Sequence, residues 1–184
     1  MAQSSIGCSH YKRRAMLLTP CCKKQYWCHY CHDAQENHRL VRKNVITIVC
    51  SNCNYPQEAR NTCRKCHVIF ATYFCQKCCL YDDTAKGQFH CDKCTICRVG
   101  GSQNFFHCDV CNMCLNIGIR ETHKCIENSG RDGCTVCLEE IHSSRMDLTV
   151  PKCGHLIHTK CFESLKSVNI TQCPTCRVEL KSIM

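Results

Sequence analysis

Cysteine constrains this chain more than any other residue type, because 25 of its 184 residues are cysteine. Such a density marks either a disulfide scaffold or a metal protein. Most of the cysteines stand in C-x-x-C pairs, and histidines lie one or two positions from several of them. A disulfide framework has no use for histidine, whereas zinc binds thiolate and imidazole together in tetrahedral sites. The spacing therefore predicts zinc as the cofactor.

The first 14 residues have neither the apolar core nor the cleavage pattern of a secretory signal. No run approaches the roughly 18 apolar residues that are needed to span a bilayer. We therefore expect no membrane association, thiols that stay in a reducing compartment, and a location in the nucleus, the cytoplasm or both.

Little of the chain is available for one large hydrophobic core. Without its cysteines, the 44% hydrophobic fraction falls to roughly 30%, with a single Trp. Small zinc modules avoid this problem, because metal binding supplies on the order of 10 kcal/mol of folding free energy per structural site. The composition therefore predicts a fold of small, irregular zinc-stabilised modules in series.

The formal charge of +9 would suggest a nucleic-acid partner. That value counts cysteine as neutral, but zinc-bound cysteine is a thiolate. Ligation of eight zinc ions by 24 thiolates would lower the net charge to about +1. Lys and Arg also form no dense block, so we do not expect nucleic-acid binding.

The cysteines fall into three blocks, over residues 8–66, 75–125 and 134–176. The segment Ile126–Gly133 carries no ligand candidate and two glycines, which predicts a linker.

Regular structure should be sparse. Val45–Val49 and Val68–Phe74 are rich in β-branched and aromatic residues, which predicts short strands. Apolar residues recur every third position over Phe162–Val168, after Thr159 as a candidate N-cap. This pattern predicts one short helix of two or three turns.

The second block contains an internal repeat. The pattern F-H-C-D-x-C-x-x-C occurs over 89–97 and returns 17 residues later over 106–114. Such periodicity predicts repeat units that each pack against the next one. The side chains of adjacent His and Cys residues diverge too far to share one ion. We therefore expect interleaved sites, with these members: Cys75, Cys78, Cys91 and Cys94; His90, Cys97, Cys108 and Cys111; His107, Cys114, His123 and Cys125.

The third block has eight ligand candidates in the order C3-H2-C3: Cys134, Cys137, Cys153, His155, His158, Cys161, Cys173 and Cys176. This spacing resembles the RING family in its two-histidine form; a PHD finger would carry Cys where His155 stands. The resemblance implies a cross-brace with a short β-hairpin and one short helix. It places Cys134, Cys137, His158 and Cys161 on one zinc, and Cys153, His155, Cys173 and Cys176 on the other. Both shells would be closed, so the metal would be structural.

The RING resemblance implies a ubiquitin-protein ligase without a covalent intermediate of its own. Such proteins hold a ubiquitin-loaded conjugating enzyme in a reactive arrangement, which is catalysis by orientation. Val136, Leu165 and Pro174 match the family's apolar contact with that enzyme, and Arg177 matches the basic residue that bridges the enzyme and ubiquitin. The alternative is that Val136 and Leu165 are core residues and Arg177 is a solvated charge.

The first block opens with Cys8-x-His10-Tyr11 and is similar to the CHY zinc finger. The second block is similar to the CTCHY zinc finger that follows it in the same family. The whole chain thus resembles the RING finger and CHY zinc finger domain-containing ubiquitin ligases. The implied boundaries are 1–70 for the CHY module, 71–126 for the CTCHY module, 127–133 for a linker, 134–177 for the RING and 178–184 for a tail.

An audit of ligands gives twelve candidates in each of the first two blocks and eight in the RING, which would fill eight tetrahedral zinc sites. The first block supplies Cys8, His10, Cys21, Cys22, Cys28, Cys31, His32, His38, Cys50, Cys53, Cys63 and Cys66. The second supplies Cys75, Cys78, His90, Cys91, Cys94, Cys97, His107, Cys108, Cys111, Cys114, His123 and Cys125. Cys79 is left over and is either a buried thiol or a replacement ligand. His29, His67 and His142 are expected to be ordinary histidines.

Grouping in the first block stays open. Cys50, Cys53, Cys63 and Cys66 suit a local four-thiolate site, and Cys8, His10, Cys28 and Cys31 suit another. That choice leaves Cys21, Cys22, His32 and His38 to share one ion, which looks sterically awkward for adjacent cysteines. A different interleaving is the alternative.

In the family, the N-terminal modules contribute to recognition of protein substrates, which are then degraded by the proteasome. The expected partners are therefore a ubiquitin-conjugating enzyme, ubiquitin and protein substrates, and a homodimer is left open. The alternatives are a non-enzymatic zinc scaffold and a zinc-knuckle nucleic-acid binder. Larger relatives carry a further zinc-binding segment after the RING, whereas this sequence ends at Met184.

Overall fold

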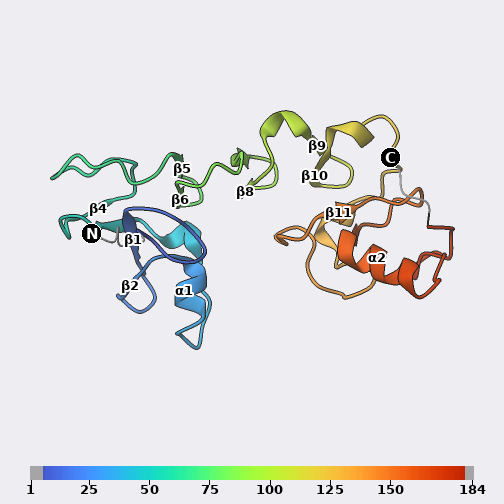
Figure 1. Ribbon diagram of the computed structural model, residues 1–184, viewed down its shortest axis with the longest axis horizontal. Coiled ribbons are helices and arrows are strands. Elements are labelled where there is room, and N and C mark those ends of the chain that lie inside the picture. The colour runs from blue at the N-terminus through green and yellow to red at the C-terminus, as the bar shows by residue number, and fades with distance from the viewer. Residues whose placement is uncertain (1–5, 181–184) are drawn as a thin grey trace. The chain divides into compact units, whose positions relative to one another are not determined.

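The computed structural model describes residues 6–180 and divides the chain into two compact units, Met1–Gln88 and Phe89–Met184. Figure 1 shows the elements of both units in order along the chain. The second module predicted over 71–126 is therefore divided between the units. Of the tail predicted over 178–184, residues 181–184 lie outside the described part. No helix among the described residues is long and apolar enough to cross a membrane.

The N-terminal unit is built on a four-stranded antiparallel sheet with the order β2-β1-β3-β4. Its strands are β1 Ala15–Leu18, β2 Gln25–Tyr26, β3 Thr47–Cys50 and β4 Pro56–Glu58. Burial alternates along β1, since successive side chains of a strand point to opposite faces. Ala15, Leu17 and Ile48 therefore enter the core of this unit.

The other elements of this unit are short. They are the helix α1 His29–Asp33, the 3₁₀ turn η1 Arg42–Asn44, and the hairpin strands β5 Tyr73–Cys75 and β6 Leu80–Asp82. The strand expected over Val45–Val49 is present as β3, shifted by two residues at its start.

The strand expected over Val68–Phe74 was wrong for most of its length. Only its last two residues belong to β5, and Ile69 forms an isolated bridge with Thr62. Asn61 explains the difference, because its side chain binds the N–H of Ala71 at 3.1 Å and the carbonyl of Ala71 at 2.8 Å. An amide side chain thus takes the place of a partner strand.

Over residues 89–180, the C-terminal unit contains three two-stranded hairpins and one α-helix of two and a half turns. The hairpin strands are β7 Phe89–Cys91 with β8 Ile96–Arg98, β9 Phe105–Cys108 with β10 Met113–Asn116, and β11 Leu148–Thr149 with β12 Ile157–His158. The remaining elements are η2 Ser102–Asn104, η3 Ile117–Ile119, η4 Ser129–Arg131 and the helix α2 Thr159–Ser167. The internal repeat is confirmed in structure, since His90 faces Cys97 across one hairpin and His107 faces Cys114 across the next.

The predicted short helix is confirmed as α2, with one difference at each end. Its N-cap is His158, and Thr159 is already the first helical residue. Phe162 and Leu165 are buried, but Val168 lies past the last turn and is 64% exposed.

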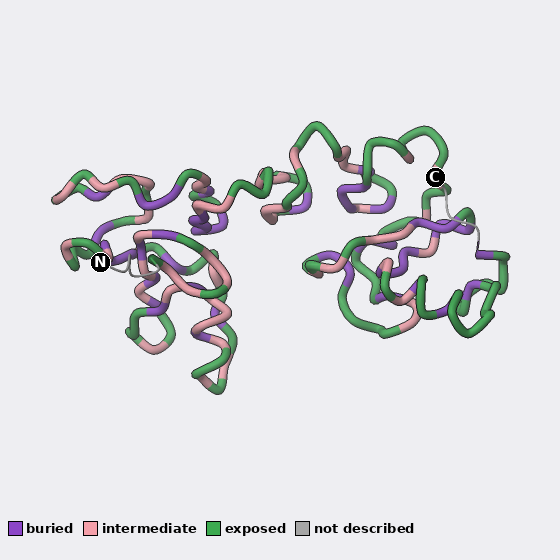
Figure 2. Tube along the Cα trace, in the orientation of Figure 1, coloured by how far each residue is buried: buried purple, intermediate pink, exposed green. Residues whose placement is uncertain are grey.

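The segment expected to be a linker is packed against the preceding hairpin. Figure 2 shows how burial varies along the trace, with buried stretches in both units. Ser129 and Gly130 are buried in η4, and the Gly130 N–H donates to the carbonyl of Cys111 at 2.8 Å. A Cβ on Gly130 would lie 2.5 Å from the Cβ of Met113, so only glycine fits there. One hydrophobic core then joins Met113 and Leu115 to residues of the last hairpin and α2.

Candidate zinc centres

Three groups of thiols and imidazoles in the N-terminal unit have ligand atoms within 4.8 Å of one another and could each hold a metal ion. They are Cys8, His10, Cys28 and Cys31; Cys21, Cys22, His32 and His38; and Cys50, Cys53, Cys63 and Cys66. The second group is the one that looked sterically awkward because two of its cysteines are adjacent, and the structure brings its four ligand atoms together. The sulfurs of the adjacent Cys21 and Cys22 lie 4.0 Å apart, and Cys21 Sγ lies 3.3 Å from His32 Nε2.

The first two groups alternate along the chain. Ligand candidates from 8–10 meet those from 28–31, and candidates from 21–22 meet those from 32–38. This is the order of a cross-brace, in which pairs one and three share a site, as do pairs two and four. The group over 50–66 is instead local, with sulfur contacts of 3.6 Å between Cys50 and Cys66 and between Cys53 and Cys63.

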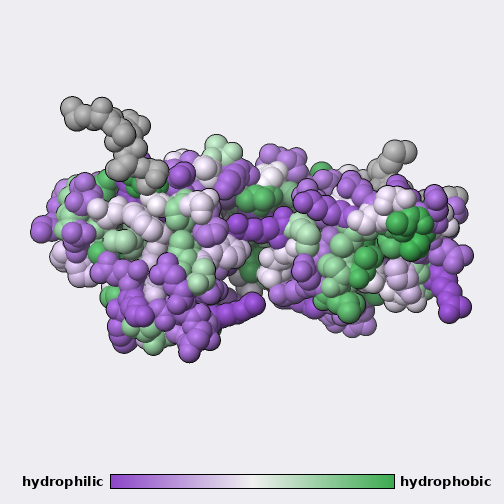
Figure 3. Space-filling view, turned by 60° about the horizontal axis from the view of Figure 1, so that its bottom comes forward, coloured by the Kyte–Doolittle hydropathy of each residue, from purple (hydrophilic) through white to green (hydrophobic). Residues whose placement is uncertain are grey.

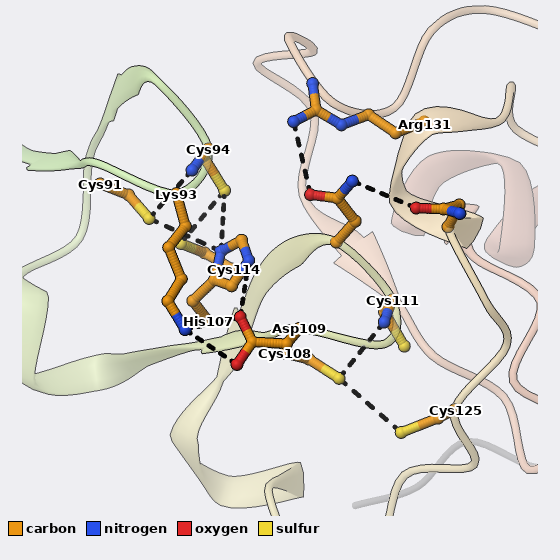
Figure 4. A network of polar contacts seen from close by, with 12 residues as sticks. Cys91, Lys93, Cys94, His107, Cys108, Asp109, Cys111, Cys114, Cys125 and Arg131 are labelled. Carbon is orange, nitrogen blue, oxygen red and sulfur yellow. Dashed lines mark hydrogen bonds and ion pairs between the residues drawn. The ribbon is translucent and has the colours of Figure 1, made fainter.

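The prediction that the repeats form interleaved sites is confirmed, but the ligands assigned to each site were wrong. Cys91 and Cys94 were expected to join Cys75 and Cys78, but the structure groups them with His107 and Cys114. Figure 4 shows these side chains pointing toward one another from two hairpins. His107 Nδ1 lies 3.2 Å from Cys94 Sγ and 3.6 Å from Cys91 Sγ, and the sulfurs of Cys94 and Cys114 are 3.6 Å apart.

Cys108 and Cys111 were likewise expected to join His90 and Cys97, but they lie with His123 and Cys125. Cys108 Sγ is 3.4 Å from His123 Nε2 and 3.7 Å from Cys125 Sγ. His107 and Cys108 point to opposite faces of β9, as successive strand residues must. The C-x-x-C of one repeat therefore meets the His and the last Cys of the repeat that follows.

Two pairs of predicted ligands remain after these groupings. In the C-terminal unit, His90 Nδ1 lies 3.7 Å from Cys97 Sγ across the β7–β8 hairpin. In the N-terminal unit, Cys75 ends β5 and Cys78 lies in the turn before β6, and both are buried.

The last block has the grouping that the RING resemblance implies. His158 Nδ1 lies 3.4 Å from Cys137 Sγ, the His158 N–H donates to Cys134 Sγ, and the Cys161 thiol contacts those of Cys134 and Cys137. In the other group, His155 Nδ1 lies 3.7 Å from Cys173 Sγ, and Cys153 contacts Cys173 and Cys176.

Carboxylates lie beside two imidazoles of the repeats, and sequence reasoning missed them. While Nδ1 of His107 faces the thiols, its Nε2 faces Asp109 at 3.7 Å, and His90 faces Asp92 in the same way at 3.3 Å. Such partners fix the ring and its tautomer in metal sites. The signal was present in the sequence, because both repeats carry Asp two residues after His. A hydrogen bond from Lys93 lowers the pKa of Asp109.

The residue after the second cysteine of a C-x-x-C pair has a left-handed backbone in seven of these turns: Asn54, His67, Cys79, Thr95, Asn112, Leu138 and Arg177 have φ between +45° and +62°. This conformation reverses the chain around the two sulfurs. It explains Cys79, whose side chain leaves the turn and packs in the core at 3% exposure. Burial raises the pKa of the Cys79 thiol to about 11. Cys79 is thus a buried thiol and no member of the groups named above.

The same geometry turns Arg177 outward from the last turn. Arg177 and Pro174 are both exposed, Val136 is half-buried, and Leu165 is 8% exposed within the RING core. The largest exposed apolar side chain here was not singled out from the sequence: Leu138, directly after Cys137, is 80% exposed.

The donor chemistry of these groups fits zinc, which prefers four thiolate and imidazole ligands in a tetrahedral shell. None of the 25 cysteines forms a disulfide. His38 Nε2 is buried without a hydrogen-bond partner among the described residues, although it belongs to a four-ligand group. A bound cation would satisfy it. Of the histidines expected to be ordinary, His29 packs against Tyr30, His67 occupies a left-handed turn, and His142 is buried.

Two protein-family models match the chain: the CHY zinc finger over residues 8–73 and the RING finger domain over 132–177. The E3 ubiquitin-protein ligase SRFP1 of Oryza sativa is 39% identical over 178 residues, which cover 95% of this chain and 68% of the relative. The E3 ubiquitin-protein ligase RZFP34 of Arabidopsis thaliana is 38% identical over 180 residues, covering 92% and 62%. Zinc finger protein BRUTUS of Arabidopsis thaliana is 35% identical, with 92% of this chain matching 14% of that protein. The chain binds zinc and belongs to the family of CHY zinc finger and RING finger proteins that includes these E3 ubiquitin-protein ligases.

Proposed function

We propose that this protein is a RING-type ubiquitin-protein ligase that promotes transfer from a loaded conjugating enzyme to lysine on protein substrates. The observation that carries the proposal is the RING itself, with two cross-braced groups of four ligand candidates and an exposed Arg177 at the end of the last turn. The relatives named as ligases support the same activity.

The chemistry requires no nucleophile from this chain. The substrate lysine attacks the carbonyl carbon of the ubiquitin thioester, the conjugating enzyme's cysteine leaves as a thiolate, and the amine loses a proton. The protein contributes by holding the thioester in a reactive geometry, which can supply several kcal/mol of the barrier reduction. Zinc would shape the surface that does this, because four protein ligands leave no position for an activated water.

Four exposed or half-exposed side chains would make the contacts. Val136 and Pro174 would pack against the conjugating enzyme, and Leu138 widens that apolar surface. Leu165 would support it from the core, with only its edge exposed. The Arg177 guanidinium has five donors in a rigid fork, so it can reach carbonyl groups on the enzyme and on ubiquitin together.

The remaining parts of the proposal concern the rest of the chain. Eight zinc ions would be bound by the 32 predicted ligands. The N-terminal modules would recognise substrates, and degradation by the proteasome would follow in the nucleus or the cytoplasm. The absence of disulfides among the 25 cysteines is consistent with a reducing compartment.

Autoubiquitination with a panel of conjugating enzymes tests the activity. We expect ubiquitin chains or adducts on the zinc-loaded protein and none after chelation. A non-enzymatic scaffold would bind a conjugating enzyme without forming adducts with any member of the panel, and that result would contradict the proposal. Native mass spectrometry of fresh, reduced protein tests the count of eight zinc ions.

A further inference from the structure

The two units differ in charge. The N-terminal unit has 13 Lys and Arg against five Asp and Glu, whereas the C-terminal unit has 11 against 10. Eleven cysteines of the N-terminal unit are predicted ligands. Eleven thiolates with three zinc ions would lower its charge only from +8 to about +3. The net charge of the zinc-loaded chain is therefore close to zero only as a sum, and the N-terminal unit by itself remains basic.

All five carboxylates of the N-terminal unit already have partners. Asp33 faces His32 and accepts from the Leu40 N–H; the other four pair as Glu36 with Lys24, Glu58 with Arg64, Asp82 with Lys86, and Asp83 with Arg14. Among the described residues of this unit, no carboxylate forms an ion pair with Arg39, Arg42 or Lys43. These three cations lie within five positions of one another.

The backbone of this region, Arg39–Ile46, is held in place. Leu40 and Val45 are anchored in the core at 8% and 5% exposure, on either side of the 3₁₀ turn η1. Hydrogen bonds fix both ends: the Leu40 N–H donates to Asp33 at 2.8 Å, and the Ile46 carbonyl accepts from the Ala59 N–H at 3.0 Å. The segment is thus pre-organised and need not be ordered on binding.

Most side chains of the Arg39–Ile46 segment are exposed. Val41 is 58% exposed and Ile46 is 73% exposed, and Arg39 and Lys43 are exposed beside them. On the face shown in Figure 3, hydrophilic side chains cover much of the N-terminal unit and the apolar patches are small and separate. Aliphatic side chains alternating with unpaired cations therefore define a specific local surface.

We infer that the Arg39–Ile46 segment is a docking surface for an acidic segment of a protein substrate that carries aliphatic side chains between its carboxylates. The inference rests on the proposed ligase function, because it names the class of substrate. Opposite charge would steer the encounter and fix the register, and Val41 and Ile46 would bury apolar area. A nucleic acid fits less well, because single strands are bound through aromatic side chains that stack on bases, and the apolar residues here are aliphatic.

Binding of a fluorescein-labelled peptide of alternating Glu and Leu, with one central Lys, tests the inference by fluorescence anisotropy. We expect Arg39→Glu/Lys43→Glu to weaken binding at least tenfold, and Val41→Ser/Ile46→Ser to weaken it several-fold. The matched control, Lys23→Glu/Arg60→Glu, makes the same charge change on exposed positions of the same unit and should weaken binding less than threefold. Equal losses in the two charge-reversal variants would overturn the inference, since only overall charge would then matter.

The same set of variants separates this inference from the ligase proposal. Discharge of ubiquitin to free lysine should be unchanged in all of them, as should zinc content, while modification of the peptide lysine falls with its affinity. Absence of ubiquitin discharge by the unaltered protein would contradict the ligase proposal. The anisotropy measurement of peptide binding would still test the docking surface by itself. Tighter binding of a poly(U) oligonucleotide than of the peptide, lost in Arg39→Glu/Lys43→Glu, would overturn the protein-segment inference in favour of RNA.

Discussion

Two parts of this molecule use the same cross-braced order of ligand candidates, one over residues 8–38 and the other over 134–176. In both, a short helix begins at the third pair of candidates: Cys28 is the N-cap of α1, and His158 is the N-cap of α2. What differs is the surface that the shared framework carries. The RING exposes Leu138 and Arg177, whereas the N-terminal module leads into the basic Arg39–Ile46 segment.

In both modules the order of the ligand candidates determines the course of the backbone. We propose that the residues between the ligands determine the partner. If so, damage to one module should remove one function only. The RING would control transfer and the N-terminal unit would select what is modified.

The largest effect is expected from removal of one thiolate in each cross-brace. Cys137→Ser should lose zinc and all ubiquitin discharge, because each structural site supplies on the order of 10 kcal/mol of folding free energy. Cys22→Ser should also lose zinc but keep discharge to free lysine, since its site lies in the other unit. Native mass spectrometry and single-turnover discharge check both. Equal loss of discharge in the two variants would break the comparison.

A change in the repeats tests the corrected grouping. Cys114→Ser should lose one metal ion and change the amide resonances of Cys91 and Cys94, which share its group. The resonances of His123 and Cys125 should stay in place. ¹⁵N spectra of the two proteins show the outcome; the opposite pattern would restore the grouping expected from sequence.

A moderate effect is expected from Arg98, which links one zinc group to the RING. Its guanidinium contacts Cys94 Sγ at 3.7 Å and donates to the His142 carbonyl at 3.4 Å. Residues that support metal ligands in this way typically change affinity by about 10- to 100-fold. Arg98→Ala should therefore speed zinc loss to a chelator by a similar factor and speed amide exchange around His142. The control is Arg120→Ala, because Arg120 lies over the Phe106 ring on the same repeat region; equal effects would contradict the role of Arg98.

The smallest effect concerns the left-handed turn residues. Leu138 has φ of +62° and is 80% exposed, so it has an unfavourable backbone and little packing to lose. That conformation costs roughly 1–2 kcal/mol for an L-residue. Leu138→Gly should raise the free energy of unfolding of zinc-loaded protein by about 0.5–1 kcal/mol in denaturant titration. Asn54→Gly should change it by only a few tenths, because Asn tolerates this region. A decrease for Leu138→Gly would show that its side chain stabilises the fold.

Sequence patterns predicted the parts of this structure that depend on local order. The RING groups follow from the spacing of eight residues, and α2 follows from the apolar residues around Phe162 and Leu165. The repeat of His and Cys also predicted correctly that adjacent ligands serve different sites.

The rest depends on contacts between distant residues. Spacing alone does not reveal whether Cys91 joins the preceding or the following repeat, because both directions satisfy the same distances along the chain. The packing of Gly130 on Met113 and the capture of Ala71 by Asn61 depend on shape and hydrogen bonding after folding. The basic surface was missed for a different reason, since the charge was summed over the whole chain.

Discharge of ubiquitin from a conjugating enzyme by Arg177→Ala tests the central claim most directly. We expect the single-turnover rate to fall at least tenfold, with zinc content and affinity for the conjugating enzyme nearly unchanged, because only the orientation of the thioester is lost. Lys152→Ala, which removes another exposed cation of the RING, should leave the rate unchanged. A normal rate for Arg177→Ala would contradict the claim that this surface controls transfer.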